Sequence, residues 1–368
     1  MKKIDVSNVN ELYAAVNNPA HAGYQILLAA GLYTLYSTLH NPGRLELQKD
    51  MELQGQKGDP SLVIIDASGL PAGSFVLPTI PGVPVRTGAI RVGNGNNKIE
   101  WMTVKGNNNA LSTIDTDLHS QLTEVEIAHL IVSGSLIGID IRNGGAISAG
   151  RKLEAHIHHN ELVDTLLQGM VIQNSVGATG AIINADLKNN YSHRNKVGIR
   201  VWNQHTNLGQ IKIESKEDRF DENGIGIIIN AGNDKNNAGA VTTANGNSIS
   251  FKLEKASIQN NIGADAASVP DLPPPGGFYI AGGFTFLVPN RTSNNTVEIE
   301  LKDCTIANNQ GTDDINAFGA RSLSTVAGIA GNNNIVNIHL HGKNKNTPVV
   351  SVPGFPLPAG TNMVNIFR

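Results

Sequence analysis

"GIRVWN", residues 198–203, opens with a glycine, continues with strictly alternating apolar and polar or aromatic side chains, and ends with an asparagine. "GIDIRN" at 138–143 and "GMVIQN" at 169–174 follow the same pattern, so the glycines lie 31 and 29 residues apart. Strict alternation predicts β-strands, and self-similarity at a period of tens of residues predicts a repeat architecture. The sequence therefore predicts a β-solenoid, in which each turn of the chain stacks on the preceding turn.

Further alternating runs separate and follow these segments. They cover residues 123–132, 153–163, 181–192, 211–220, 249–261 and 297–309. One turn cannot bury its apolar face alone, but turns stacked about 4.8 Å apart close a continuous core. We expect Ile139, Ile172 and Ile199 to point into that core. The asparagines that end the segments share one corner, where stacked amides form a structural ladder; they are Asn143, Asn174 and Asn203.

Composition agrees with a turn-rich all-β chain. The 368 residues include 39 glycines and 16 prolines, and only 16% are charged. A net charge of −3 argues against a nucleic acid partner, and no apolar run is long enough to span a membrane. The single cysteine, Cys304, excludes an internal disulfide. The start "MKKIDVSNVNELYAAV" lacks the apolar stretch of a signal peptide. We therefore expect either a cytoplasmic protein or a secreted or periplasmic protein whose leader has been removed.

Residues 5–345 resemble the right-handed parallel β-helix proteins of the pectin-lyase type. The stretch "VNELYAAVNNPAHAGYQILLAAGLYTL" at 9–35 is similar to their beginning, where a short amphipathic helix covers the open end before a strand and a Gly-x-Tyr turn. The resemblance implies one β-helix domain over 1–368. Its expected parts are a cap and first coil at 1–40, coils at 41–345 with long loops at 263–295 and 310–332, and a tail at 346–368 that packs on the helix.

One outward strip carries the candidate site. The side chains that alternate with the inward residues are Asp140, Val171 and Arg200 in one row, and Arg142, Gln173 and Trp202 in the next. An aromatic platform and a guanidinium fork suit the ring face and the carboxylate of a sugar. We therefore expect an exposed, sugar-binding groove here, and the resemblance implies the same, because enzymes of the superfamily generally place their clefts on this sheet. A solvated sheet face is the alternative.

The residue types favour elimination over hydrolysis. β-Elimination from a uronate needs a cation for the carboxylate and a base for the α-proton. Arg200 and Arg142 would hold the carboxylate, and His193, Arg194 or Lys196 in "SHRNK" would lie near the proton. Hydrolysis needs two carboxylates, and the strip supplies only Asp140. The predicted catalytic residues are Arg200, Arg142, Asp140, His193 and Lys196; the predicted substrate-binding residues are Trp202, Gln173, Arg194 and Tyr279.

We expect no metal and no other cofactor. Counting back from the turns places Glu126, His156, Asp186 and Glu214 in one row, and Ala128, His158, Lys188 and Lys216 in the next. His156 and His158, with Asp186, are a conceivable metal site, but cross-strand charge pairing is the favoured interpretation. The calcium-binding aspartate clusters and the Trp-Ile-Asp-His motif of pectate lyases are absent. Asp313 and Asp314 resemble the carboxylate pair of polygalacturonases, whose other motifs are missing, so a turn is favoured there.

Two proline-rich apolar segments, 269–289 and 347–360, are predicted to leave the coil as long loops. Their aromatic residues need cover from the helix flank, from a second subunit in a homo-oligomer, or from an apolar ligand. Three functions stay open. The first is an enzyme, favoured as a lyase, that acts on an acidic polysaccharide or oligosaccharide. The second is a non-catalytic carbohydrate-binding or structural surface protein. The third is a small-molecule enzyme with a pocket enclosed by these loops.

Overall fold

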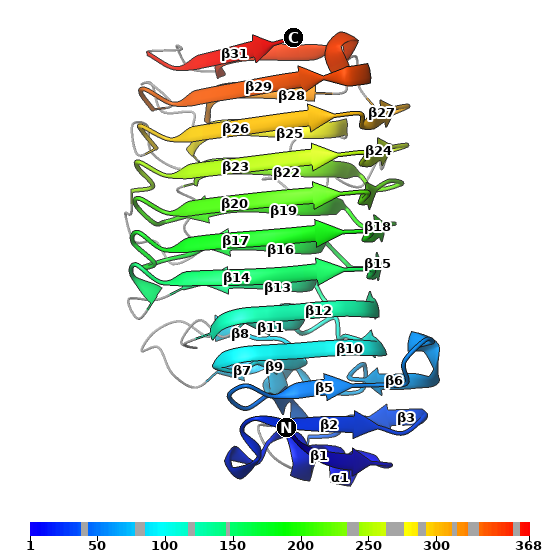
Figure 1. Ribbon diagram of the computed structural model, residues 1–368. Coiled ribbons are helices and arrows are strands. Elements are labelled where there is room, and N and C mark those ends of the chain that lie inside the picture. The colour runs from blue at the N-terminus through cyan, green and yellow to red at the C-terminus, as the bar shows by residue number, and fades with distance from the viewer. Residues whose placement is uncertain are drawn as a thin grey trace. The chain divides into compact units, whose positions relative to one another are not determined.

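The protein is an all-β, right-handed parallel β-helix with an N-terminal helical cap, as the sequence predicts (Figure 1). The computed structural model describes residues 1–37, 43–77, 85–116, 122–144, 148–233, 243–262, 276–285, 292–310, 315–322, 331–355 and 361–368. The chain divides into two compact units, which are described separately. Unit 1 comprises Met1–Arg142 and Leu153–Val171, and unit 2 comprises Asn143–Lys152 and Ile172–Arg368. The division falls within β13 (Ile137–Asn143), β14 (Lys152–His158) and β16 (Gln168–Asn174).

The cap of unit 1 is α1 (Val9–Val16), which follows β1 (Lys2–Val6). Asn8 caps the helix by accepting a hydrogen bond from the Glu11 amide, and Glu11 in turn accepts from the Ser7 amide. The helix buries one face against the first strands, and the Tyr13 hydroxyl donates to the Gly43 carbonyl at 2.7 Å. The helix thus covers apolar surface that the first coil would otherwise expose.

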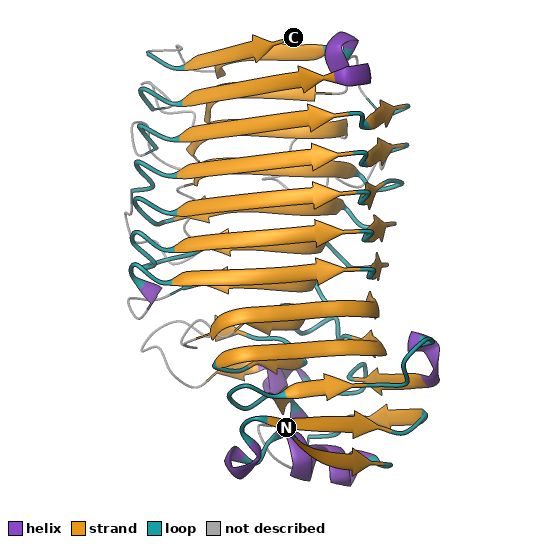
Figure 2. Ribbon diagram, viewed as in Figure 1, coloured by secondary structure: helices purple, strands orange, loops and turns teal. Residues whose placement is uncertain are grey.

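Unit 1 has two parallel sheets (Figure 2). The strands of its sheet A are β1, β2 (Tyr24–Leu28), β3 (Gly31–Thr34), β5 (Glu52–Gln54), β6 (Val63–Asp66), β10 (Gly95–Lys105), β12 (Leu122–Ser133), β14 and β15 (Glu161–Val163). The strands of its sheet B are β4 (Leu45–Glu46), β9 (Ile90–Val92), β11 (Ser112–Thr116) and β13. β7 (Val76–Leu77) and β8 (Val85–Arg86) form a separate antiparallel pair. Four 3-10 helices complete the described helices of the chain: Pro19–His21, Pro60–Leu62, Ala72–Phe75 and, in unit 2, Gly342–Asn346.

Unit 2 repeats the same coil. Its sheet A contains β17 (Ile182–Lys188), β18 (Tyr191–His193), β20 (Gln210–Lys216), β21 (Arg219–Phe220), β23 (Ser248–Glu254), β24 (Ser257–Gln259), β26 (Thr296–Lys302), β27 (Thr305–Ala307), β29 (Ile335–His341) and β31 (Met363–Phe367). Its sheet B contains β19 (Val197–Gln204), β22 (Ile225–Asn233), β25 (Gly276–Thr285), β28 (Ile315–Ser322) and β30 (Val349–Phe355). β30 pairs in parallel register with β28, and β31 pairs in parallel register with β29. The expected tail at 346–368 therefore contributes strands to both sheets of the helix.

The residues of the repeat have the structural roles that the pattern predicts. Ile139, Ile172 and Ile199 are fully buried. In unit 2, Asn174 donates to the Asn203 side chain at 2.8 Å and accepts from Asn143 at 3.1 Å, which confirms the ladder. The glycine that opens a segment of the repeat is required by close packing. A Cβ on Gly198 would lie only 2.6 Å from the Gly226 carbonyl oxygen.

The expected long loops are only partly loops. Residues 276–285 form β25 and residues 315–322 form β28, and these two strands pair with each other in parallel register. Phe286, Asp313 and Asp314 lie outside the described residues, as do the parts of the two proline-rich segments at 269–275, 286–289 and 356–360. No helix in the described part of the chain is long and apolar enough to cross a membrane.

Candidate functional site

A column of charged residues runs along the outward side of sheet B in unit 1. We call Glu46, Arg91, Asp115 and Asp140 the charged column. Each member is the register partner of the next, on β4, β9, β11 and β13. Neighbouring parallel strands lie about 4.8 Å apart, so the column places two carboxyl groups on adjacent coils with an arginine beside them.

Asp115 in the charged column has one carboxyl oxygen without a hydrogen-bond partner. Its side chain is buried, and one carboxyl oxygen, Oδ2, accepts hydrogen bonds from the Gly88 amide at 2.9 Å and from Thr87 Oγ1 at 3.2 Å. The other oxygen, Oδ1, is buried without a hydrogen-bond partner. Burial raises the pKa of Asp115 to about 6, with a further increase from Asp140, against the opposing effect of Arg91. Asp115 therefore titrates in the range that acid–base catalysis uses.

Three arginines surround the carboxylates of this column. Arg44 binds Glu46 at 2.9 Å, Arg91 lies 3.7 Å from the same carboxylate, and the Arg142 guanidinium contacts Asp140. A cavity of about 170 Å³ lies at one end of the column, lined by residues 46–49 and 91–94, which include Glu46 and Arg91. Unit 1 thus combines buried acid groups, guanidinium groups and a small adjoining cavity.

Unit 2 contains a second cluster on its own sheet B, which we call the aromatic–arginine cluster: Arg200, Trp202, Tyr279, Phe318 and Arg321. The Arg200 guanidinium lies 3.7 Å from the centre of the Trp202 ring. Arg321 lies 5.0 Å from the Tyr279 ring, which in turn packs 5.2 Å from Phe318. Burial raises the pKa of Tyr279 to about 12, so its hydroxyl stays protonated. The cluster offers cations and aromatic faces without a carboxylate among its members.

The prediction of an exposed groove is wrong, because most of the side chains expected to line it are buried. Arg200 is 3% exposed and Trp202 is 9% exposed, and Asp140, Gln173 and Tyr279 are buried as well. A sheet with one solvated face would show alternating exposure along each strand. Instead β16 and β22 are buried at every position, so these strands have protein on both faces.

The remaining predicted residues lie on different elements. Gln173 precedes Asn174 and Trp202 precedes Asn203, and because these two asparagines are bonded to each other, Gln173 and Trp202 are neighbours on adjacent coils. His193 ends β18, where its ring stacks on Tyr191 with centroids 4.0 Å apart. Arg194 is exposed and Lys196 is partly exposed in the turn that leads to β19.

The predicted register of sheet A is confirmed within each unit. Glu126 pairs with His156 and Ala128 with His158 in unit 1, while Asp186 pairs with Glu214 and Lys188 with Lys216 in unit 2. The charge pairing is present too: His158 lies 3.4 Å from Glu126. His156 lies 3.8 Å from a different carboxylate, that of Glu124.

Sequence reasoning missed Asp115 and Arg91. The segment "STIDT" at 112–116 lacks the glycine and the asparagine that mark the segments at 138–143, 169–174 and 198–203. A signal was nevertheless present, because the pair Ile114–Asp115 recurs 25 residues later as Ile139–Asp140. These two pairs are register partners in the structure.

No protein-family model matches the sequence, and no curated protein matches it. Solved structures similar to this chain include the A-module of mannuronan C-5 epimerase AlgE4 from Azotobacter vinelandii, at 13% identity and a TM-score of 0.44 over 99% of this chain and 98% of that one. An alginate lyase from Paenibacillus sp. str. FPU-7 has 10% identity and a TM-score of 0.33 over 100% and 99% of the two chains. The catalytic domain of a GH87 α-1,3-glucanase has 12% identity and a TM-score of 0.40 over 100% and 68%. These similarities leave the activity to be argued from the site itself.

Proposed function

We propose that the protein is a carbohydrate-active enzyme that acts on an acidic, uronate-containing polysaccharide or oligosaccharide, with its reaction centre at the charged column. The observation that carries the proposal is Asp115. It is a buried carboxyl group with an unpartnered oxygen, beside a second carboxylate and close to arginines. A buried polar atom without a partner is rare in folded proteins, and such groups cluster where a ligand or a reacting group completes them.

β-Elimination is the reaction that this arrangement supports best. Arg91 and Arg142 would neutralise the uronate carboxylate, which acidifies the proton on the adjacent ring carbon. Asp115 in its ionised form would remove that proton. The electron pair left on carbon then forms the ring double bond, the bond to the glycosidic oxygen breaks, and the departing oxygen takes up a proton. The products are an unsaturated uronate at one new end and a sugar hydroxyl at the other.

Hydrolysis is the second candidate, and one observation favours it. Asp115 and Asp140 are register partners on adjacent strands, so the chain does supply the carboxylate pair that the sequence appeared to lack. A spacing of about 5 Å is typical of glycosidases that retain anomeric configuration, in which one group protonates the leaving oxygen and the other attacks the sugar. In that reaction Asp115, with its raised pKa, would be the acid.

The pH profile separates the two reactions. As the base of an elimination, Asp115 must be ionised, so kcat/KM should rise with pH through about 6. As the acid of a hydrolysis, it must be protonated, so kcat/KM should fall as pH rises through about 6. The assay would offer alginate and polygalacturonate and would follow both the absorbance of the unsaturated product and the release of reducing ends.

Two matched variants test the assignment of Asp115. Asp115→Asn keeps the size of the side chain and removes its proton chemistry, so it should lower kcat by at least about 100-fold. Asp218→Asn is the control, because Asp218 is also buried with a pKa raised to about 6 but is held by Ser215 and Asn190 in a corner of unit 2. If neither uronate polymer is cleaved, or if Asp115→Asn retains full activity, the proposed function is wrong.

We propose separately that the aromatic–arginine cluster binds sugar. Arg200 and Trp202 combine a guanidinium with an aromatic face, the two groups that suit a uronate, and Gln173 is the neighbour of Trp202. Because the cluster is buried, a single uronate unit is the ligand that suits it, and Trp202→Ala should weaken the binding of a monomeric uronate by about 1–3 kcal/mol in titration calorimetry. Equal affinity in this variant and in the native protein would exclude the cluster as a binding site.

A further inference from the structure

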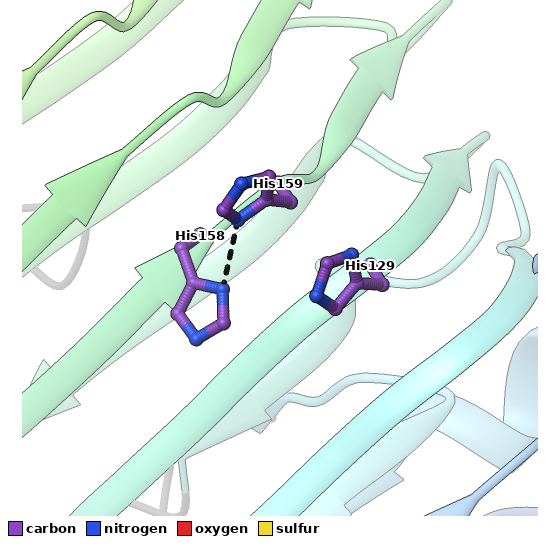
Figure 3. Close-up of side chains that lie close together, drawn as sticks. All are labelled: His129, His158 and His159. Atoms are coloured by element: carbon purple, nitrogen blue, oxygen red, sulfur yellow. Dashed lines mark hydrogen bonds between the residues drawn. The ribbon is translucent and has the colours of Figure 1, made fainter. Parts of the chain in front are cut away.

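Three histidines gather at one bend of unit 1, on sheet A rather than on the sheet that carries the charged column. They are His129 on β12, and His158 and His159 at the end of β14 (Figure 3). One ring nitrogen of each lies within 4.8 Å of those of the other two, and His158 Nδ1 is 3.1 Å from His159 Nδ1. Among the described residues, this is the only group of three or more metal-ligating side chains at such a spacing.

The backbone explains how the chain brings these rings together. Ala128 pairs with His158, so the residues that follow them, His129 and His159, lie at the same bend of adjacent coils. Both have positive φ, 55° and 57°, and their rings stack with centroids 4.8 Å apart. Trp101 has the same conformation on β10, and its ring stacks on His129 at 3.8 Å, which limits the rotation of that imidazole.

The bend itself does not require histidine. In unit 2 the corresponding bend residues, which follow the register partners Lys188, Lys216, Glu254 and Lys302, are Asn189, Glu217, Lys255 and Asp303. All four have positive φ between 54° and 59°. Because four other residue types adopt the same conformation, the two imidazoles at the bend of unit 1 need another explanation. His158, which is not a bend residue, adds a third imidazole to the same space.

The geometry points to a site for one divalent transition-metal ion, with His129, His158 and His159 as ligands. Two nitrogens that bind one tetrahedral ion at 2.0–2.1 Å lie roughly 3.3 Å apart, close to the distance between the two Nδ1 atoms. The third nitrogen, on His129, lies within 4.8 Å of the other two, so a small shift of the histidine side chains towards one another completes the ligand set. An all-nitrogen ligand set selects Zn²⁺, Ni²⁺, Co²⁺ or Cu²⁺ over Mg²⁺ and Ca²⁺, which prefer oxygen.

Neighbouring groups prepare the site for a cation. His158 Nε2 lies 3.4 Å from Glu126, the carboxylate–histidine arrangement that orients metal ligands and leaves the other ring nitrogen, Nδ1, available to the ion. His159 is exposed, which gives the ion access from solvent and leaves room for water as a fourth ligand.

Titration calorimetry and metal analysis test the site in the full-length protein. After treatment with chelator and dialysis, the protein should bind one equivalent of Zn²⁺. His129→Asn and His159→Asn remove an imidazole but keep a residue that suits the bend, as Asn189 does in unit 2. Each should weaken Zn²⁺ binding by more than the 10–100-fold that is typical of outer-shell changes, and Glu126→Gln should fall within that range.

Two controls make the result specific. His156→Gln changes a histidine on the same strand but outside the cluster, and the double variant of His339 and His341 removes a surface pair whose rings lie 6.4 Å apart in unit 2. Both should bind Zn²⁺ as the native protein does. In a Trp202→Phe background, where Trp101 is the only remaining tryptophan, Co²⁺ should quench the fluorescence of that residue. Absence of stoichiometric Zn²⁺ binding would overturn the assignment. So would an affinity for Zn²⁺ in His129→Asn and His159→Asn equal to that of the native protein.

Discussion

Arg200 shows how a single side chain differs from what alternation predicts. It points outward from the core, yet it is buried, and its guanidinium carbon lies over the Trp202 ring, 3.7 Å from the ring centre. A guanidinium stacks on an indole and is more weakly hydrated than an ammonium, so its burial depends on its shape as well as its charge. The contact with the Trp202 ring is therefore one source of the stability that this residue contributes.

Arg200→Lys tests that contact. Lysine keeps the charge but cannot stack as a plane, so the free energy of unfolding should fall by about 1 kcal/mol in urea denaturation. Lys188→Arg, on the exposed side of β17, is the control and should change the free energy of unfolding by less than about 0.5 kcal/mol. An unchanged midpoint for Arg200→Lys would show that the stacked geometry contributes nothing.

At the scale of the element, each strand is fixed by its inward residues. Ile199 on β19 is fully buried and pairs with Ile227 on β22. Ile199→Asp places an unpaired charge in this core, so the variant should lose several kcal/mol of unfolding free energy and should fail to give soluble, cooperatively folding protein. Recovery of such protein would show that the inward assignment of the repeat is wrong.

The asparagine ladder adds a second, weaker constraint at the corner of each coil. Asn203→Ala removes the oxygen that accepts a hydrogen bond from Asn174 in a fully buried position. We expect a loss of about 1–3 kcal/mol in the free energy of unfolding, measured by urea denaturation. Gln210→Ala, which removes an exposed amide on the adjacent β20, should have almost no effect. Equal losses in the two variants would contradict the role of the ladder.

At the scale of the whole molecule, two buried carboxyl groups link stability to pH. Asp115 in unit 1 and Asp218 in unit 2 have their pKa values raised from 3.8 to about 6 by burial. Between pH 4 and 6 the unfolded chain releases these protons while the folded protein keeps them. Their contribution to the free energy of unfolding is therefore complete below pH 4, falls as pH rises to about 6, and is lost above it.

This linkage predicts a difference between variants. Asp115→Asn removes one of the two groups, so its unfolding free energy should decline less between pH 4 and pH 6 than that of the native protein. The difference should be on the order of 2 kcal/mol, because each pKa unit corresponds to about 1.4 kcal/mol. Chemical denaturation at four pH values across this range measures it. Parallel pH curves for the variant and the native protein would contradict the raised pKa.

The sequence predicts the fold well because period and alternation report on the core. The positions of Ile139 and Ile199, and the pairing of Glu126 with His156, follow from counting residues. Alternation says which side chains share a face, but it does not say whether that face is covered, so the burial of Trp202 could not be predicted. Asp115 was missed because its short strand has Thr113 where the repeat has glycine and ends before the position of the asparagine.

The histidine cluster was missed for a different reason. His129 and His159 lie at bends with positive φ, where the period-2 rule that assigns faces no longer applies. The same bends have a consequence for how this architecture can change. Within each unit such bends recur on adjacent coils about 4.8 Å apart, and the bends named above hold tryptophan, histidine, asparagine, glutamate, lysine or aspartate with the same backbone conformation. A point mutation there can exchange one chemical group for another without altering the core. Rows of such positions are therefore where a β-helix can acquire new ligands at little cost to folding.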